Sequence, residues 1–131
     1  MRDQILTYLR SQALGSFNVS SELPREEGGV GLAQKNHKTI YVNVEQFQDS
    51  PLIATLGGLS IHSTTTTVSV TFAVDAKNIP ANYSSLVNSI MGARDLNSST
   101  EFFNSREAVV ETSTDADMLT TTIDLNYVKI R

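Results

Sequence analysis

The sequence contains no cysteine and only two histidines, His37 and His62. Without cysteine the chain forms no disulfide and has no thiolate for catalysis or metal binding. Neither histidine has a second ligand at the spacing of a metal site, which would be four residues along a helix or two along a strand. We therefore expect no metal site and interpret both histidines as surface residues.

The motifs of well-known catalytic and ion-binding sites are also missing. No serine lies in a G-x-S-x-G turn. The glycine-rich residues 28–31 are followed by Leu-Ala-Gln-Lys and not by the Lys-Ser/Thr of a phosphate-binding loop. Asp115 and Asp117 lack the glycine and the bidentate glutamate of a calcium loop, and residues 112–115 suit a hairpin turn as well. The chain is therefore not expected to be an enzyme.

Charge is scarce as well. Charged residues make up 18% of the chain, below the ~25% typical of soluble domains, and threonine, serine and asparagine take their place. A partner covers such neutral polar strands at a lower desolvation cost than charged ones. The ten basic residues form no cluster and are outnumbered by fourteen acidic ones, for a net charge of −4. This balance argues against a nucleic-acid-binding protein.

Long apolar runs are absent too, and none is long enough to cross a bilayer. Residues 1–4 lead into an amphipathic segment, where a signal peptide would have its apolar core. The length of 131 residues suits one domain, 1–131. The sequence thus indicates a soluble, cytosolic, single-domain protein.

Two segments have the periodicity of amphipathic helices. In residues 2–14 the apolar side chains fall on one face, and Gly15 is a natural stop. Residues 80–94 begin with Pro80, which suits a first helical turn. Their apolar stripe consists of Tyr83, Leu86, Val87, Ile90 and Met91.

Other segments alternate as strands do. Residues 39–47 place Ile40, Val42 and Val44 on one face, and Asp49-Ser50-Pro51 is expected to end this strand. Further strand patterns are a short one at 17–19, a bend or short strand at 52–59, an irregular strand at 101–113 and an alternating strand from 119 to the C-terminus.

The strongest strand signal is residues 61–76. Val68, Val70, Phe72 and Val74 share a face, but toward the N-terminus the same face continues with His62, Thr64 and Thr66. A strand that runs past its own core is expected to project beyond it. Threonine has a high strand propensity, and the backbone groups at the edge of such a strand can form hydrogen bonds with another strand. A solvated hairpin arm and a protein–protein contact are equally compatible with this pattern.

Residues 20–38 form a long loop interrupted by Pro24 and three glycines. A loop of this length without structure of its own is uncommon in a compact domain. It is therefore flexible in the isolated protein or becomes ordered on assembly.

The order of elements is helix, strand, strand, helix, strand, strand. Strands 39–47 and 61–76 have a short connection and should pair antiparallel. We therefore predict an α+β two-layer sandwich, with a mostly antiparallel sheet of four to five strands and two helices on one face.

This order and several local patterns resemble the tail terminator, or minor tail completion, proteins of lambdoid-type bacteriophages. The resemblance covers nearly the whole chain but involves no short motif, so no individual functional residue is carried over. The segments that carry it are the amphipathic helix Asp3–Leu14, the long loop, the strand Ile40–Val44, the strand Val68–Val74, the helix Tyr83–Met91 and the C-terminal strand Thr120–Val128.

The resemblance implies a homo-oligomeric, hexameric ring that stops polymerisation of the tail tube and joins the tail to the head-completion proteins of the neck. It implies no cofactor and no enzymatic activity, a place at the tail–neck junction of the virion, and assembly in the host cytoplasm. DNA would be passing cargo, and the acidic net charge suggests an electronegative channel that DNA does not stick to. The alternatives are another neck or head–tail connector protein, a tail tube subunit, or a small monomeric module with a ligand between helix 80–94 and the sheet.

A ring of identical subunits needs two different patches that meet. The half-strand Ser60–Thr67 and the loop Arg25–Lys38 are the candidates for these patches. The predicted interface residues are Arg25, Glu26, Glu27, His37, Lys38, His62, Thr64, Thr65, Thr66 and Thr67.

Overall fold

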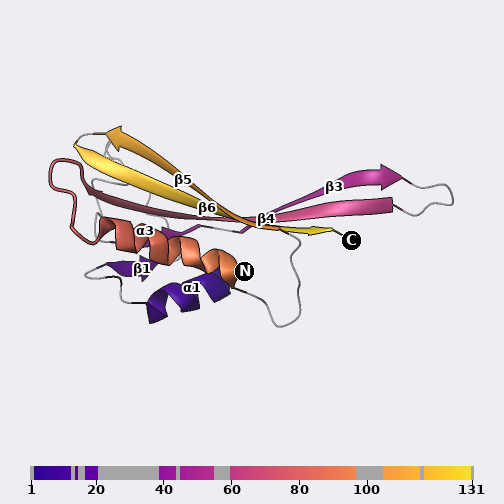
Figure 1. The fold of residues 1–131 in the computed structure, drawn as a ribbon, viewed down its shortest axis with the longest axis horizontal. Helices are drawn as coiled ribbons and strands as arrows, with labels where there is room; N and C mark the ends of the chain where they lie inside the picture. The colour runs from indigo at the N-terminus through magenta and orange to yellow at the C-terminus, as the bar shows by residue number, and fades with distance from the viewer. Residues whose placement is uncertain are drawn as a thin grey trace.

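The chain has an α+β fold, and its described residues form a mixed six-stranded sheet with two α-helices on one face (Figure 1). The computed structural model describes residues 2–12, 14, 17–20, 39–43, 45–54, 60–96, 105–115 and 117–130. The sheet has one strand more than the upper limit of the sequence prediction. The expected long loop at 20–38 lies outside the described residues, apart from Ser20.

The helices are α1 (Arg2–Ser11), α3 (Tyr83–Met91) and a 3-10 turn, η1 (Gly92–Asp95), that continues α3. The strands are β1 (Asn18–Ser20), β2 (Thr39–Val42), β3 (Gln46–Ala54), β4 (Ser60–Asp75), β5 (Ser105–Asp115) and β6 (Met118–Ile130). Their order in the sheet is β1-β2-β4-β6-β5, and β3 also pairs with β4. Only β1 and β2 pair in parallel, so the sheet is mostly antiparallel, as predicted.

The core lies between the sheet and the two helices. The second half of β4 supplies the apolar face that its alternation predicts, and every second residue of β6 faces the same way. The helical stripes predicted from the sequence fill the other side. The buried core side chains are Ile5, Leu6, Leu9, Leu14, Ile40, Val42, Val68, Val70, Phe72, Val74, Leu86, Ile90, Ala93, Ile123, Leu125 and Tyr127.

Both helices are shorter than the sequence patterns suggested. The first ends at Ser11 instead of residue 14, although Leu14 is still buried in the core. The second begins at Tyr83 and not at Pro80, because residues 80–82 form a turn in which the Tyr83 amide donates to the Pro80 carbonyl at 3.1 Å. The helices therefore cover less of the sheet than expected.

Two tyrosines connect the helix layer to the sheet by hydrogen bonds. The Tyr127 hydroxyl of β6 donates to the Ala93 carbonyl of η1 at 2.8 Å, and the Tyr83 hydroxyl lies 2.8 Å from the hydroxyl of the fully buried Thr121. Burial raises the pKa of the Tyr127 hydroxyl well above its ordinary value, and nearby Arg106 offsets part of this effect. The neutral hydroxyl is thus the form that the fold accommodates.

The expected strand 39–47 is divided into β2 and β3. Both lie along the same edge of β4, and the Asn43 amide between them donates to the Ser69 carbonyl at 2.8 Å. The prediction that Pro51 ends this strand is wrong, because β3 continues through it to Ala54. An edge strand tolerates proline, and the register shifts between Pro51 and Ile53, as at a β-bulge.

The turn between β5 and β6 comes later than predicted. Residues 112–115 belong to β5, and Asp115 pairs directly with Met118. The turn therefore lies between Asp115 and Met118, where Asp117 has a φ of 64°. Two-residue hairpin turns favour such left-handed backbone, which asparagine and aspartate adopt more readily than most residues. This geometry accounts for an aspartate at position 117 without a bound ion.

The buried Tyr127 hydroxyl predicts a specific loss of stability at alkaline pH. Above about pH 10, the ordinary tyrosine pKa, the unfolded state releases this proton while the folded state keeps it, so the free energy of unfolding falls. The loss attributable to Tyr127 approaches about 1.4 kcal/mol per pH unit. Tyr127→Phe should be about 1 kcal/mol less stable at neutral pH and should lose less stability between about pH 10 and 11.

Urea unfolding of both proteins across this pH range measures the difference. Equal slopes for the two proteins would contradict the burial of a neutral hydroxyl at this position.

Candidate assembly interface

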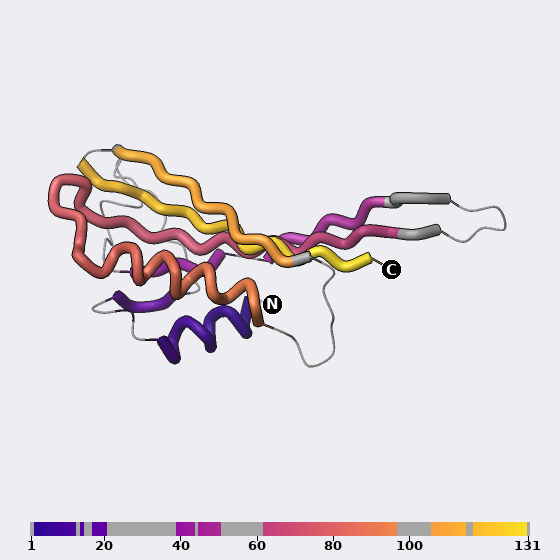
Figure 2. The backbone as a smooth tube through the Cα atoms, viewed as in Figure 1, coloured from indigo at the N-terminus to yellow at the C-terminus, as the bar shows by residue number. Residues whose placement is uncertain are grey.

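The first half of β4 and the whole of β3 form a hairpin that extends away from the body of the molecule (Figures 1 and 2). We call residues 46–54 and 60–67 the arm. Its strands pair from Gln46↔Thr67 to Ala54↔Ser60. The end of β6 accompanies the arm as far as Ile130↔Ser63, beyond which only β3 and β4 remain paired. The sequence prediction that β4 projects past its own core is confirmed.

The arm projects because the helices are too short to cover β4. The 16 residues of β4 span about 54 Å at about 3.4 Å per residue. The nine residues of α3 span only about 14 Å. The last row with core contacts is Thr66–Tyr127, where Tyr127 reaches the Ala93 carbonyl of η1. Beyond this row, the helix-side positions of β4 are occupied by Thr64 and His62, whereas a hydrophobic core would need apolar residues there.

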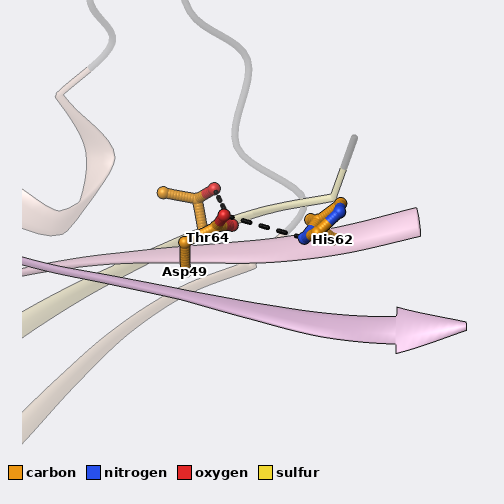
Figure 3. Close-up of polar contacts among 3 residues, drawn as sticks. All are labelled: Asp49, His62 and Thr64. Atoms are coloured by element: carbon orange, nitrogen blue, oxygen red, sulfur yellow. Dashed lines mark hydrogen bonds and ion pairs between the residues drawn. The ribbon is translucent and has the colours of Figure 1, made fainter. Parts of the chain in front are cut away.

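Three polar residues meet on the helix-side face of the arm (Figure 3). The Thr64 hydroxyl donates to the Asp49 Oδ1 atom at 3.1 Å, and the His62 Nδ1 atom lies 3.6 Å from Asp49 Oδ2. The Asp49 side chain is 62% exposed and that of His62 is 37% exposed. Exposed ion pairs contribute little to stability, so this cluster is a feature of the surface and not a source of stability for the fold.

The predicted interface residues of β4 do not share one surface. His62 and Thr64 face the helix side, whereas Thr65 and Thr67 face the opposite side, because consecutive strand residues alternate. Thr66 is only 7% exposed and packs near the core. The other predicted interface residues lie outside the described residues: Arg25, Glu26, Glu27, His37 and Lys38. The role of all ten stays a prediction.

The opposite face of the sheet, which we call the outer face, carries a ladder of polar side chains between β4 and β6. The Thr67 hydroxyl donates to Asn126 at 2.7 Å, and the Ser69 hydroxyl donates to Asp124 at 2.5 Å. By register, Glu107 and Glu111 of β5 lie on the same face. Among the described residues, this face has several carboxylates and no lysine or arginine.

The two strands at opposite edges of the sheet carry exposed apolar side chains. Phe47 of β3 is 70% exposed, and Val109 and Val110 of β5 are 42% and 39% exposed. Within the described part of the chain, the pairing partner of β5 is β6 and that of β3 is β4. Sequence analysis missed these residues as interface candidates. The signal was the adjacent pair Val109-Val110, which breaks the alternation of a strand with one buried face.

Two hollows lie next to α1. One of about 440 Å³ is lined by Asp3, Gln4, Thr7, Tyr8, Ser11 and Leu96. The other, of about 310 Å³, is lined by Leu9, Arg10, Gln12, Leu14, Phe17, Asn18 and Val19. Neither lies between α3 and the sheet, where the binding-module alternative places a ligand.

The described residues contain no group of three or more histidine, aspartate or glutamate side chains that could hold a metal ion. None of the helices in the described ranges is long and apolar enough to cross a membrane. No protein-family model matches the chain, and no curated protein is significantly similar to it in sequence.

The exposure of the arm predicts that its polar cluster can be removed without loss of the fold. Asp49→Ala should change the free energy of unfolding by less than about 0.5 kcal/mol. Ile123→Ala, at a fully buried position of β6, should cost about 2–5 kcal/mol. Urea unfolding of both variants tests this contrast. A loss in Asp49→Ala as large as that in Ile123→Ala would show that the arm belongs to the stabilising core.

Proposed function

We propose that the chain is a structural virion protein, a tail terminator whose ring caps the tail tube and joins the tail to head-completion proteins. The observation that carries the proposal is the arm, which extends past the helix layer and whose residues 46–49 are exposed. The resemblance of the whole element order to phage tail terminators supplies the biological context. Under this proposal the chain is not an enzyme, needs no cofactor and acts at the tail–neck junction after assembly in the host cytoplasm.

An arm of this kind suits a closed ring better than a two-fold dimer. A ring of identical subunits joins one patch to a different patch on the next copy. The projecting hairpin is one such patch, and it differs from every other described surface of the subunit. Its half-buried threonines and exposed glutamines can be desolvated at lower cost than charged side chains. The proposed ring has six members, the number implied by the resemblance.

The outer face of the sheet suits the wall of a channel for DNA. Its described residues include Asp124, Glu107 and Glu111 without a balancing cation. A carboxylate-lined wall repels the phosphates of DNA, so DNA would pass without binding. Under this proposal the outer face points toward the ring axis and the helices point outward.

Two alternatives lead to different observations. A neck connector or a tail tube subunit would also assemble through an arm, and would differ in whether it ends or extends the tube. A monomeric ligand-binding module would need space between α3 and the sheet. The stripe of α3 is occupied there, since Leu86 and Ile90 are buried and Tyr83, Val87 and Met91 pack against the core. The occupied stripe favours an assembly protein.

Native mass across a concentration series tests the proposal. We expect light scattering after size exclusion to show a ring-sized species that grows with concentration, at low and at moderate salt. In a matched control, residues 51–62 are replaced by Asn-Gly, which joins the directly paired Ser50 and Ser63 by a two-residue turn. This control should keep the circular dichroism spectrum of the body and stay monomeric.

A wild-type chain that is monomeric at every concentration would contradict the proposal. Thermal stabilisation of that monomer by a metabolite would instead support the binding module.

A further inference from the structure

We infer that β5 is the receiving edge of the ring, and that β3 of a second copy pairs with it to continue the sheet from subunit to subunit. This inference rests on the proposed ring and names the two strands that form its seam. It replaces the loop 25–38 of the sequence prediction by a strand on the opposite edge of the sheet from the arm.

The first argument is the pair of exposed apolar side chains at the centre of β5. An edge strand presents backbone groups that can pair with a strand of another chain. β5 has 11 residues and no proline, and its charged residues lie on either side of a central Ala108-Val109-Val110 segment. Val109 and Val110 leave it apolar on both faces, since consecutive strand residues point to opposite sides. A partner strand along β5 would cover these two valines.

The second argument is the composition of the arm. β3 has nine residues, similar in length to β5, and carries the most exposed large apolar side chain of the described chain, Phe47. Phe47 and Val110 both face the helix side of the sheet, so the proposed seam removes both from water on the same face. Burial of apolar area contributes about 25 cal/mol per Å², and cross-strand pairs of aromatic and β-branched residues pack well.

The third argument is strand direction. β3 is antiparallel to β4, β4 to β6, and β6 to β5, so β3 and β5 run in opposite directions within one copy. Rotation about a ring axis along the strands preserves the direction of each strand. β5 of one copy therefore meets β3 of the next as an antiparallel pair, which matches the pairing on either side of the seam.

The last argument is the offset of the two edges. β5 lies level with residues 65–75 of β4, whereas β3 lies level with residues 60–67. Joining them requires a shift of about 20 Å along the strands, at about 3.4 Å per residue. Each copy contributes β3, β4, β6 and β5, which are together about 19 Å wide at about 4.8 Å per strand. A shift of about 20 Å along the strands over this width corresponds to a strand tilt of about 45° from the ring axis. Closed β-barrels have strand tilts of about 35–45°, and the seam is therefore compatible with a closed ring.

The absence of native cysteine makes site-specific cross-linking a direct test. Gln48→Cys places a thiol on β3, and Val109→Cys places one on β5. Both positions are exposed, and both face the outer side of the sheet. The two variants are mixed under conditions where the wild type associates and are treated with a short bismaleimide. The matched control mixes Gln48→Cys with Thr7→Cys, which is exposed on α1.

We expect at least about tenfold more cross-linked dimer from the Gln48–Val109 mixture than from the control mixture or from either variant alone. Cross-linking of Val109→Cys with itself would show a two-fold contact between β5 strands and would overturn the inference. Equal cross-linking in the control mixture would overturn it as well.

Native mass of the same samples separates the two proposals. A ring-sized species without the Gln48–Val109 product would overturn this seam and leave the ring itself standing. A monomer without the product would overturn both.

Discussion

The pairing of β4 with β6 is the interaction on which the rest of the structure depends. It runs without a break from Asp75↔Met118 to Ser63↔Ile130 and thus continues past the end of the helix layer. In the body it aligns the apolar residues of both strands under α1 and α3. In the arm it aligns threonines, for which the helices are too short to provide a cover. One continuous strand pair therefore belongs to both the hydrophobic core and the arm, and the arm lies outside that core.

The two faces of this ladder have different chemistry. The helix-side face changes from valine to threonine at Thr66. On the outer face, hydroxyls of the middle of β4, at Thr67, Ser69 and Thr71, bond to side chains of β6. On the helix-side face, the change at Thr66 marks the end of the hydrophobic core. On the outer face, Tyr41, Thr71 and Ala73 are buried, while the charged residues Glu107 and Glu111 of β5 are exposed.

Much of the fold could be predicted from the sequence, because its strongest signals are periodic. The alternation Val68-Val70-Phe72-Val74 identifies the core face of β4, and its loss toward His62 predicts a projecting strand. Pro51 misled the analysis, because proline ends a central strand but not an edge strand, and edge position is a tertiary property. The sixth strand was missed because Ile40, Val42 and Val44 alternate as one strand would, whereas the helix-side face changes from even residues in β2 to odd residues, such as Phe47, in β3.

The candidate interface was less predictable than the fold. The threonine run suggested a single surface, but strand geometry divides it between two faces and partly buries Thr66. The exposed residues of β5 carry no motif, and only the sheet order shows that they lie at an edge. Which strand ends a sheet depends on pairing between segments far apart in the sequence, and single-sequence periodicity contains no information on it.

The central claim is that the arm and the outer edge of β5 are surfaces for another copy of the chain. Hydrogen–deuterium exchange at low and high protein concentration tests it most directly, because it reads backbone bonding strand by strand. The account predicts that amides of β3 and β5 exchange more slowly at high concentration, while those in the centre of β4 and β6 are protected equally at both. Association with slowed exchange confined to α1 and α3, and none at β3 or β5, would contradict it.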